Sequence, residues 1–361
     1  SPAPKPVTQA FFDAYQSWHE RGAGLAKHYE AMRDSVTDEV RAKLARFLGC
    51  DPDELAFTAN CTEGMNIVAS GLAWQAGDEV IITDQEHPAN SFFWMYHHER
   101  LGVKVRILEL CHDHEELLVR FRKLLNPRTR LVAISHVTTT NGHILPIWEM
   151  VEATHQNGSL ILVDGAHAVG QIPVNLHELR CDFYAMNGHK WLMGPAGTGA
   201  VFIRRDRLDL VSPVWVGDVK GHKFRYAEDG SLVLPHEARR HEFATRNWAL
   251  IVGLGRAIDY VEEIGVDLIR SRVRMLADRL KQRLREVPGM KLLSPWDPDH
   301  SMGLVTFEVE GHPGPQLYAQ LEARGICPRY LFNAIRVSIG YYTLQEELDA
   351  MVDAIKEIVK E

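Results

Sequence analysis

The sequence predicts an α/β fold, with a large domain on a mainly parallel sheet and a small α+β domain at the carboxyl end. Between residues 55 and 205, short apolar runs alternate with segments of helical periodicity, which is typical of βαβ units. After Gly265 the pattern changes to a long charged amphipathic helix, followed by short strands and two further helices. A chain of 361 residues, 45% of them hydrophobic, is long enough to bury one large core and a smaller second one.

Three segments are expected along the chain. Residues 1–30 are predicted to form an N-terminal segment that packs with the small domain, residues 31–254 the large domain, and residues 255–361 the small domain. Aromatic residues at helical spacing predict a first helix over residues 8–30. An acidic first turn and a glycine at the end predict a second helix over residues 37–48.

Composition excludes several classes of partner. The net charge is −8 and no basic stripe with interleaved aromatic residues is present, so nucleic acid is not an expected partner. The five cysteines form no Cys-x-x-Cys pair, which fits a reducing compartment such as the cytoplasm and argues against a disulfide framework or a zinc site, and no metal is expected. No apolar run approaches the roughly 18 residues of a membrane helix, so no membrane partner is expected.

A lysine and an aspartate carry the strongest chemical signal. The apolar run over residues 160–163 predicts a buried strand, and Asp164 stands at its carboxyl end, where ligands bind in open α/β sheets. Lys190 follows the next strand-like run in a glycine-rich, apolar setting. Pyridoxal 5′-phosphate (PLP) needs a lysine for its Schiff base and an acid for its pyridine nitrogen. The alternatives are a helix-capping Asp164 and a surface Lys190.

A second signal indicates an anion site. A short strand over residues 55–58 is followed by a helix start at Asn60-Cys61-Thr62-Glu63, in which Asn60 and Glu63 resemble a capping box. A helix N-terminus after a strand and tight turn favours a bound phosphate, held by backbone amides and the Thr62 hydroxyl. The alternative is a well-capped helix without a ligand.

Together these motifs resemble the class V, fold-type I PLP enzymes. That family includes cysteine desulfurases, cysteine C–S lyases, isopenicillin N epimerase-like proteins and some aminotransferases, and the resemblance runs from about Pro6 to the end of the chain. It implies a seven-stranded type of mainly parallel sheet between helices. It also implies a homodimer with shared active sites and an amino acid as substrate.

The resemblance implies roles for several residues around the cofactor. His87 matches an aromatic residue that stacks on the pyridine face; its alternative is a plain loop histidine. Thr62 and His189 correspond to phosphate-binding positions. Two positions depart from the family: Cys61 stands where a second threonine is frequent, and Asn187 stands where relatives often have a phosphate-binding serine.

Further positions are implied around the phenolic oxygen of PLP and at the subunit boundary. His167 matches a position, often glutamine, that bonds this oxygen; the alternative is a core histidine. Relatives often place an asparagine near Thr139, so either Thr139 or Asn141 is expected to serve here. Thr245 corresponds to a threonine that reaches the phosphate of the partner subunit.

One arginine stands inside an apolar strand near the end of the chain. Arg336 needs a partner there, either a core carboxylate in a structural ion pair or the substrate carboxylate in a bidentate clamp. The resemblance favours the clamp, with Arg329 and Tyr330 nearby. Cysteine desulfurases carry a nucleophilic cysteine before this arginine, but Cys327 precedes a proline at the end of an expected strand and is interpreted as an inert thiol.

The expected catalytic residues are therefore Lys190, Asp164 and His87. The predicted reaction is β-elimination from cysteine or an S-substituted cysteine, as in C–S lyases, giving pyruvate, ammonia and a thiol or other sulfur species. Amino-acid epimerisation, resembling isopenicillin N epimerase, is the first alternative and transamination the second. A non-catalytic scaffold is a remote fourth, against which the intact Lys190 and Asp164 argue.

Overall fold

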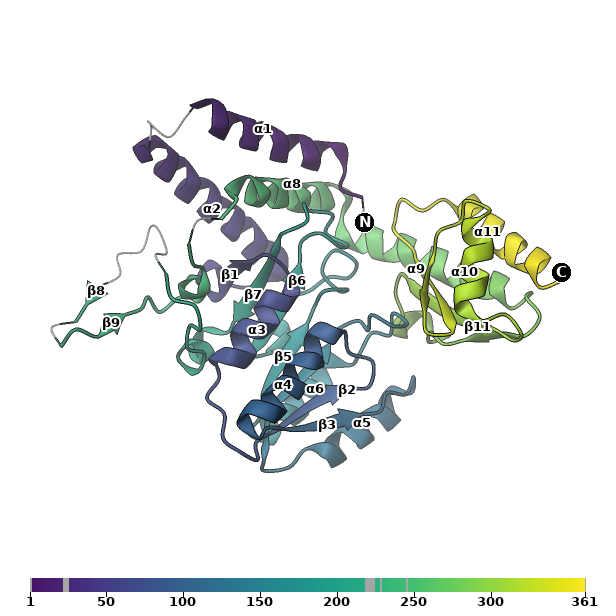
Figure 1. Cartoon of the computed structure of the whole chain (residues 1–361), viewed down its shortest axis with the longest axis horizontal. Helices are drawn as coiled ribbons and strands as arrows, with labels where there is room; N and C mark the ends of the chain where they lie inside the picture. Colours follow the sequence, from purple (N-terminus) through teal and green to yellow (C-terminus); the bar gives the residue numbers. More distant parts are fainter. Residues whose placement is uncertain (1, 22–25, 218–224, 228, 245, 361) are drawn as a thin grey trace.

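The computed structural model describes residues 2–21, 26–217, 225–227, 229–244 and 246–360 (Figure 1). A seven-stranded sheet forms the centre of the larger part, in the order β1-β7-β6-β5-β4-β2-β3. Strand β7 is antiparallel to both of its neighbours, and the other pairs are parallel. The strands are β1 (Leu55–Thr58), β2 (Glu79–Thr83), β3 (Lys104–Leu108), β4 (Thr129–Ser135), β5 (Leu160–Asp164), β6 (Phe183–Asn187) and β7 (Gly199–Ile203).

Helices cover both faces of this sheet. The helices of this part are α1 (Lys5–Arg21), α2 (Ala26–Leu48), α3 (Cys61–Gly71), α4 (Phe92–Leu101), α5 (His114–Leu124), α6 (Ile147–Gln156), α7 (Leu176–Leu179) and α8 (Trp248–Ile264). Helix α1 packs on α8 and not directly on the sheet (Figure 1). One core cluster combines Ile161 and Val163 of β5 with residues of α2, α5, α6 and α8, whereas the other combines Leu162 with residues of α3 and α4. This split follows from the alternation of side chains along a strand. The sheet is therefore sandwiched between two helical layers.

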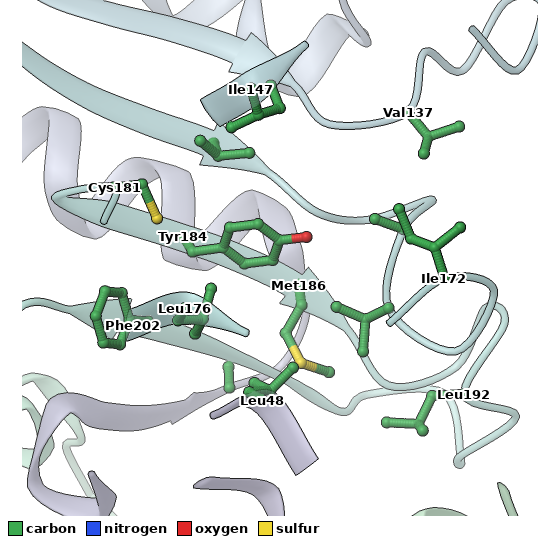
Figure 2. Packing of buried hydrophobic residues seen from close by; sticks show 14 of the residues in the cluster. Leu48, Val137, Ile147, Ile172, Leu176, Cys181, Tyr184, Met186, Leu192 and Phe202 are labelled. Carbon is green, nitrogen blue, oxygen red and sulfur yellow. The ribbon is translucent and has the colours of Figure 1, made fainter. Parts of the chain in front are cut away.

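Figure 2 shows part of the first cluster, in which Tyr184 and Met186 of β6 gather with Leu48, Ile172 and Leu192. All five side chains are largely buried. Leu192 follows Lys190 by two residues, so burial of this apolar side chain fixes the loop that presents the lysine.

A four-stranded antiparallel sheet in the order β10-β11-β13-β12 forms the smaller part. Its buried core joins this sheet to the helices that flank it. The elements are α9 (Val266–Leu284), β10 (Met290–Leu292), β11 (Leu304–Val309), α10 (Gly314–Glu322), β12 (Arg329–Leu331), β13 (Ala334–Ser338) and α11 (Gln345–Ile358). Short elements complete the described residues: η2 (Pro52–Glu54), η3 (Pro88–Asn90), η4 (Arg205–Leu210), η5 (Ala238–His241), η6 (Pro298–His300), β8 (Arg225–Tyr226) and β9 (Leu232–Val233).

Backbone and side-chain hydrogen bonds join the loop after β4 to the smaller part. Asn141 Nδ2 donates to Leu293 O at 3.0 Å, and Met302 N donates to Gly142 O at 3.0 Å. Ile144 N donates to His300 O at 2.9 Å. These bonds hold the segment between β10 and β11 of the smaller sheet beside the carboxyl-end edge of the large sheet, which is the edge at which ligands are expected.

The N-terminal helices differ from expectation. The second helix begins at Ala26 instead of Thr37, because no proline or glycine interrupts residues 26–48 and continued helix is favoured over a cap. The first helix ends at Arg21 and packs against α8. The expected boundary between residues 254 and 255 falls inside α8. The division into domains stays a prediction. None of the described helices has the length and hydropathy needed to traverse a bilayer.

Candidate active site

Polar residues meet at the carboxyl-end edge of the central strands. Asp164 ends β5, where it is paired with Ser135 of β4, and Asn187 ends β6. Parallel strands place their carboxyl ends on one edge, so residues distant in the chain come together there. Asn187 Oδ1 accepts a hydrogen bond from Cys61 N at 2.9 Å, which ties the end of β6 to the first residue of α3.

Asp164 is a buried carboxylate with a defined set of donors. It is 5% exposed. Its Oδ1 accepts from Ala166 N at 2.8 Å and from Cys61 Sγ at 3.2 Å. Burial, and then the negative charge of Asp164, raise the pKa of the Cys61 thiol well above its usual value. The thiol therefore keeps its proton and acts as the donor in this pair.

Lys190 lies on the loop between β6 and β7, beside His167. Its Nζ is 3.0 Å from His167 Nε2. Desolvation lowers the pKa of the Lys190 amine, against the opposing charge of Asp164, which raises it. A lysine with a lowered pKa is a better nucleophile and base near neutral pH than an exposed one. His189, directly before it, has its pKa lowered chiefly by burial.

The start of α3 borders a cavity of about 610 Å³. Thr62 lines this cavity together with Asn60, which caps α3 by accepting a hydrogen bond from Glu63 N at 2.9 Å. Much of the remaining lining is apolar or aromatic: Ile67, Tyr96, Val214, Trp215 and Phe243. The expected anion position at this helix start is therefore open on one side, and Thr62 is exposed there.

Arg336 extends from β13 to the loop after β4. Its Nη1 donates to Thr139 O at 2.6 Å and to Thr139 Oγ1 at 3.4 Å. Burial lowers the pKa of the Arg336 guanidinium, and the charge of Arg329 lowers it further. Among the described residues, the buried Nε of Arg336 finds no hydrogen-bond partner. A core carboxylate does not pair with this arginine in the described part of the chain.

Thr139 and Asn141, either of which is expected to bond the phenolic oxygen of PLP, have different surroundings. Asn141 Oδ1 accepts from Thr138 Oγ1 at 2.6 Å, while its Nδ2 donates to Leu293 O. The amide of Asn141 is thus engaged in holding the loop. Thr139 lies beside Arg336 instead.

The strand register separates Arg329 from Tyr330. Arg329 is paired with Arg336 across β12 and β13, so both side chains share one face of the small sheet. Tyr330 is paired with Ile335 on the opposite face, and its ring lies 5.4 Å from that of Tyr318 in α10. The structure therefore brings Arg329 toward Arg336 and does not bring Tyr330 there.

His87 lies at the rim of the same region. Its Nδ1 accepts from Ala89 N at 3.1 Å at the start of η3, and its side chain is exposed. Desolvation of the ring, and next the positive charge of Lys190, lower the pKa of His87. Thr245, expected to act across subunits, lies outside the described residues.

One contact in this region has no counterpart among the expected site residues. Trp191 Nε1 donates to His167 Nδ1 at 3.1 Å. Its only sequence signal is the position directly after Lys190. A tryptophan in an apolar stretch is ordinarily assigned to the core, so periodicity alone does not find it.

Comparison with known proteins assigns the family. The family model for aminotransferase class-V matches residues 1–351. The chain belongs to this family. Isopenicillin N epimerase of Streptomyces clavuligerus is 34% identical over 371 residues, which cover 96% of this chain and 92% of that protein. Cysteine desulfurase of Dickeya dadantii (strain 3937) is 32% identical over 345 residues, which cover 91% and 82%.

Solved structures confirm the predicted fold. The complex of the cystine C–S lyase C-DES with its reaction product cysteine persulfide has a TM-score of 0.90 and 27% identity, covering 98% of this chain and 94% of that chain. The apo structure of cysteine desulfurase from Thermococcus onnurineus NA1 has a TM-score of 0.90 and 28% identity, covering 100% and 92%. A lysine-to-alanine variant of C-DES carries glycine covalently linked to its PLP cofactor.

Proposed function

We propose that this class V family member is a PLP-dependent C–S lyase. Its reaction is β-elimination from cysteine or an S-substituted cysteine. The observation that carries the proposal is the placement of Lys190, with a desolvated amine 3.0 Å from His167, at the sheet edge that also holds the buried Asp164. A lysine with a buried acid at the same edge is the pair that PLP requires.

The side chains at this edge fit PLP, because each polar part of the cofactor finds a group of suitable charge or hydrogen-bonding capacity. Asp164 is a buried carboxylate, which is stable when a cationic or protonated group faces it, and a pyridinium nitrogen is such a group. The N-terminus of α3, with Thr62 beside it, suits the phosphate. Lys190 supplies the amine that binds the aldehyde carbon, and His189, His87 and Thr139 complete the proposed set. When bound, PLP withdraws electrons from the α-carbon of an amino acid.

Within this site the chain itself performs binding and proton transfer. The Arg336 guanidinium, with its Nε lacking a described partner, binds the substrate α-carboxylate, which also restores the hydrogen bonding of that nitrogen. Arg329 lies on the same sheet face and adds positive charge. Once the substrate's amino group has taken its place on the cofactor, Lys190 Nζ would be free to take the proton from the α-carbon, and its lowered pKa favours the neutral amine that this requires.

Elimination follows when the bond between the β-carbon and sulfur breaks. The sulfur leaves with the bonding electron pair and takes a proton. Water then releases the remaining three-carbon unit as pyruvate and ammonia, so one water molecule is consumed for each substrate. C-DES, a structural neighbour at a TM-score of 0.90, is described as a cystine C–S lyase with cysteine persulfide as its product. This likeness supports elimination over transamination.

The proposal includes a homodimer that shares its active sites. Around the cavity beside Thr62, Trp215 is 63% exposed, Tyr96 is 52% exposed and Val214 is 52% exposed. Phe92, in the same helix as Tyr96, is 65% exposed. Large apolar side chains gathered in this way are typical of surfaces that another chain covers. A second copy covering this cavity also closes the open side of the phosphate position.

Amino-acid epimerisation is the second candidate, and one observation favours it. Isopenicillin N epimerase shares 34% identity with this chain over nearly the whole length of both proteins. Epimerisation also begins with removal of the α-proton, but needs an acid on the opposite face and no leaving group.

The test is to incubate the PLP-loaded protein with cystine and a panel of S-substituted cysteines, without added keto acid. A C–S lyase forms pyruvate and a thiol or persulfide in equal amounts. Cys327→Ala is the matched variant, because Cys327 takes no part in the proposed steps. The expected place of Cys327 at the end of a strand is wrong: it is exposed in the loop between α10 and β12. We expect the variant to keep full activity, and its inactivity would point to a desulfurase. Exchange of α-deuterium into both configurations without pyruvate would establish the epimerase instead.

A further inference from the structure

Trp191 contacts the imidazole of His167 through its only polar atom. The indole Nε1 donates to His167 Nδ1 at 3.1 Å, and the two rings meet edge to face with centroids 6.3 Å apart. Trp191 is 9% exposed, so solvent does not compete freely for this bond. Because an indole N–H is a donor only, Nδ1 of His167 must be an acceptor.

This contact decides which nitrogen of His167 carries the proton. An imidazolium carries a hydrogen on both nitrogens, so a ring whose Nδ1 accepts a hydrogen bond is neutral. Burial favours the same state, because it lowers the pKa of His167 well below its usual value. A neutral imidazole has one donor and one acceptor nitrogen. With Nδ1 as acceptor, Nε2 carries the hydrogen. The group 3.0 Å from Nε2 is Lys190 Nζ, which must then accept through a lone pair. An ammonium group has no lone pair, so the accepting Lys190 is the neutral amine.

We propose that Trp191 is a positioning residue that locks His167 in its Nε2–H tautomer and thereby holds Lys190 as a neutral amine. Trp191 acts through His167, not on the substrate. The consequence for catalysis rests on the proposed role of Lys190, whereas the tautomer of His167 does not. The phenolic oxygen of PLP, which the resemblance assigns to His167, is also an acceptor, so the same tautomer serves before and after the cofactor binds.

The loop that carries His167 is held in place for this contact. His167 O accepts from Gln171 Nε2 at 2.6 Å, and Ala168 N donates to Gly165 O at 3.0 Å. Gly170 has a φ of +91°, and a Cβ there would lie 2.5 Å from Trp191 C. Only glycine allows the backbone of Trp191 to approach so closely. The indole and the imidazole are therefore set against each other by backbone contacts on both sides.

The tautomer is measured directly on the protein without cofactor. Protein labelled with ¹⁵N-histidine is compared by NMR with the His167→Gln variant, which identifies the His167 signals. We expect a protonated Nε2 and an unprotonated Nδ1 in the unmodified protein. A protonated Nδ1 there overturns the proposal without reference to any variant's folding. In Trp191→Phe we expect a mixture of both tautomers, and an unchanged single tautomer in that variant also overturns it.

The rate at which PLP loads onto Lys190 is a second readout, because it depends on how much of the amine is neutral. In Trp191→Phe, we expect PLP to load onto Lys190 about fivefold more slowly at pH 7, the size of effect that loss of one ordinary hydrogen bond produces. Raising the pH should restore the rate, since it restores the neutral amine. Trp74→Phe is the matched control: its indole donates to Ala69 O at 2.7 Å, away from His167. Slower loading by the same factor at every pH would show a purely structural role and overturn the proposal. Failure of Lys190 to bind PLP at all would refute the proposed function and leave the tautomer result standing.

Discussion

The thiol of Cys61 donates a hydrogen bond to Oδ1 of Asp164 across 3.2 Å. This bond joins the first residue of α3 to the last residue of β5. Burial and the charge of Asp164 keep the thiol protonated, so Cys61 serves as a neutral donor to the carboxylate. The departure from the family's threonine thus places a sulfur donor on the carboxylate that is proposed to hold the pyridine nitrogen of PLP.

We predict that Asp164→Asn keeps the fold and loses most activity. A neutral amide cannot stabilise a protonated pyridine nitrogen, and a hydrogen bond to a charged group contributes about 1.5–3 kcal/mol. That energy corresponds to a fall in kcat/KM of roughly tenfold to a hundredfold or more. The control is Asp84→Asn, an exposed carboxylate after β2, two strands from β5 in the sheet, whose Oδ1 accepts from Leu110 N at 3.1 Å. Turnover close to that of the unmodified protein would rule out the role given to Asp164.

We predict that borohydride fixes PLP to Lys190 and to no other lysine. The protein as purified should be yellow, and peptide mass spectrometry after reduction should place the added mass on the peptide with Lys190. Lys281 is an internal control, because it is also buried, at 1% exposed, and its pKa is lowered by burial. Its Nζ donates a hydrogen bond to Ser301 Oγ, within the smaller part of the molecule. Added mass on Lys281 would contradict the assignment.

We predict a homodimer in which Thr245 of one subunit completes the site of the other. Lys190→Ala and Thr245→Ala proteins should each be nearly inactive. Mixed after dissociation, they should form hybrid dimers with one site lacking both side chains and one site intact, so that activity returns. No gain on mixing would place Thr245 in the site of its own subunit, and a monomer active at high dilution would remove the shared site altogether.

We predict that acid destabilises the protein through buried neutral histidines. Burial lowers the pKa of His143 to about 3 and that of His136 to about 4, below the unfolded value of about 6.5. The unfolded chain therefore binds more protons than the folded chain in this window. The contribution of the two histidines to the free energy of unfolding is fully present above about pH 6.5. It is lost as the pH falls toward their folded pKa values, by about 1.4 kcal/mol per pH unit for each histidine.

The variant His143→Gln tests this window. His143 is fully buried, with His114 Nε2 at 3.1 Å from its Nε2 and with His112 and His300 nearby, so a charge there finds no compensating anion among these neighbours. Urea unfolding at several pH values should show a smaller loss of stability between pH 6.5 and pH 4 for the variant. Above pH 7 the difference between the two proteins should be constant. An equal slope for both proteins below pH 6.5 would show that His143 does not titrate on unfolding.

Local sequence signals predict the strands and many of the helices. The strand expected over residues 55–58 is β1 with the same bounds, and the run expected over residues 160–163 is β5, which the structure extends by one residue to Asp164. The start predicted for the second helix, at residue 37, is wrong, because an acidic pair after a threonine resembles a helix start even within a continuous helix. The roles of the individual site residues stay predictions, since geometry places them without testing what they do.

The sequence by itself determined the family, the α/β fold, and the positions of Asp164 and Lys190 after strand-like runs, because these are properties of neighbouring residues. Only the tertiary structure decided that Cys61 faces Asp164, that Thr139 contacts Arg336, and that Trp191 bonds His167. The first two contacts depend on sheet order and on how the small sheet packs against the large one. The third depends on a close backbone approach at Gly170. Local periodicity carries none of this, because hydrogen bonds between distant segments form only after packing has set their distance and direction.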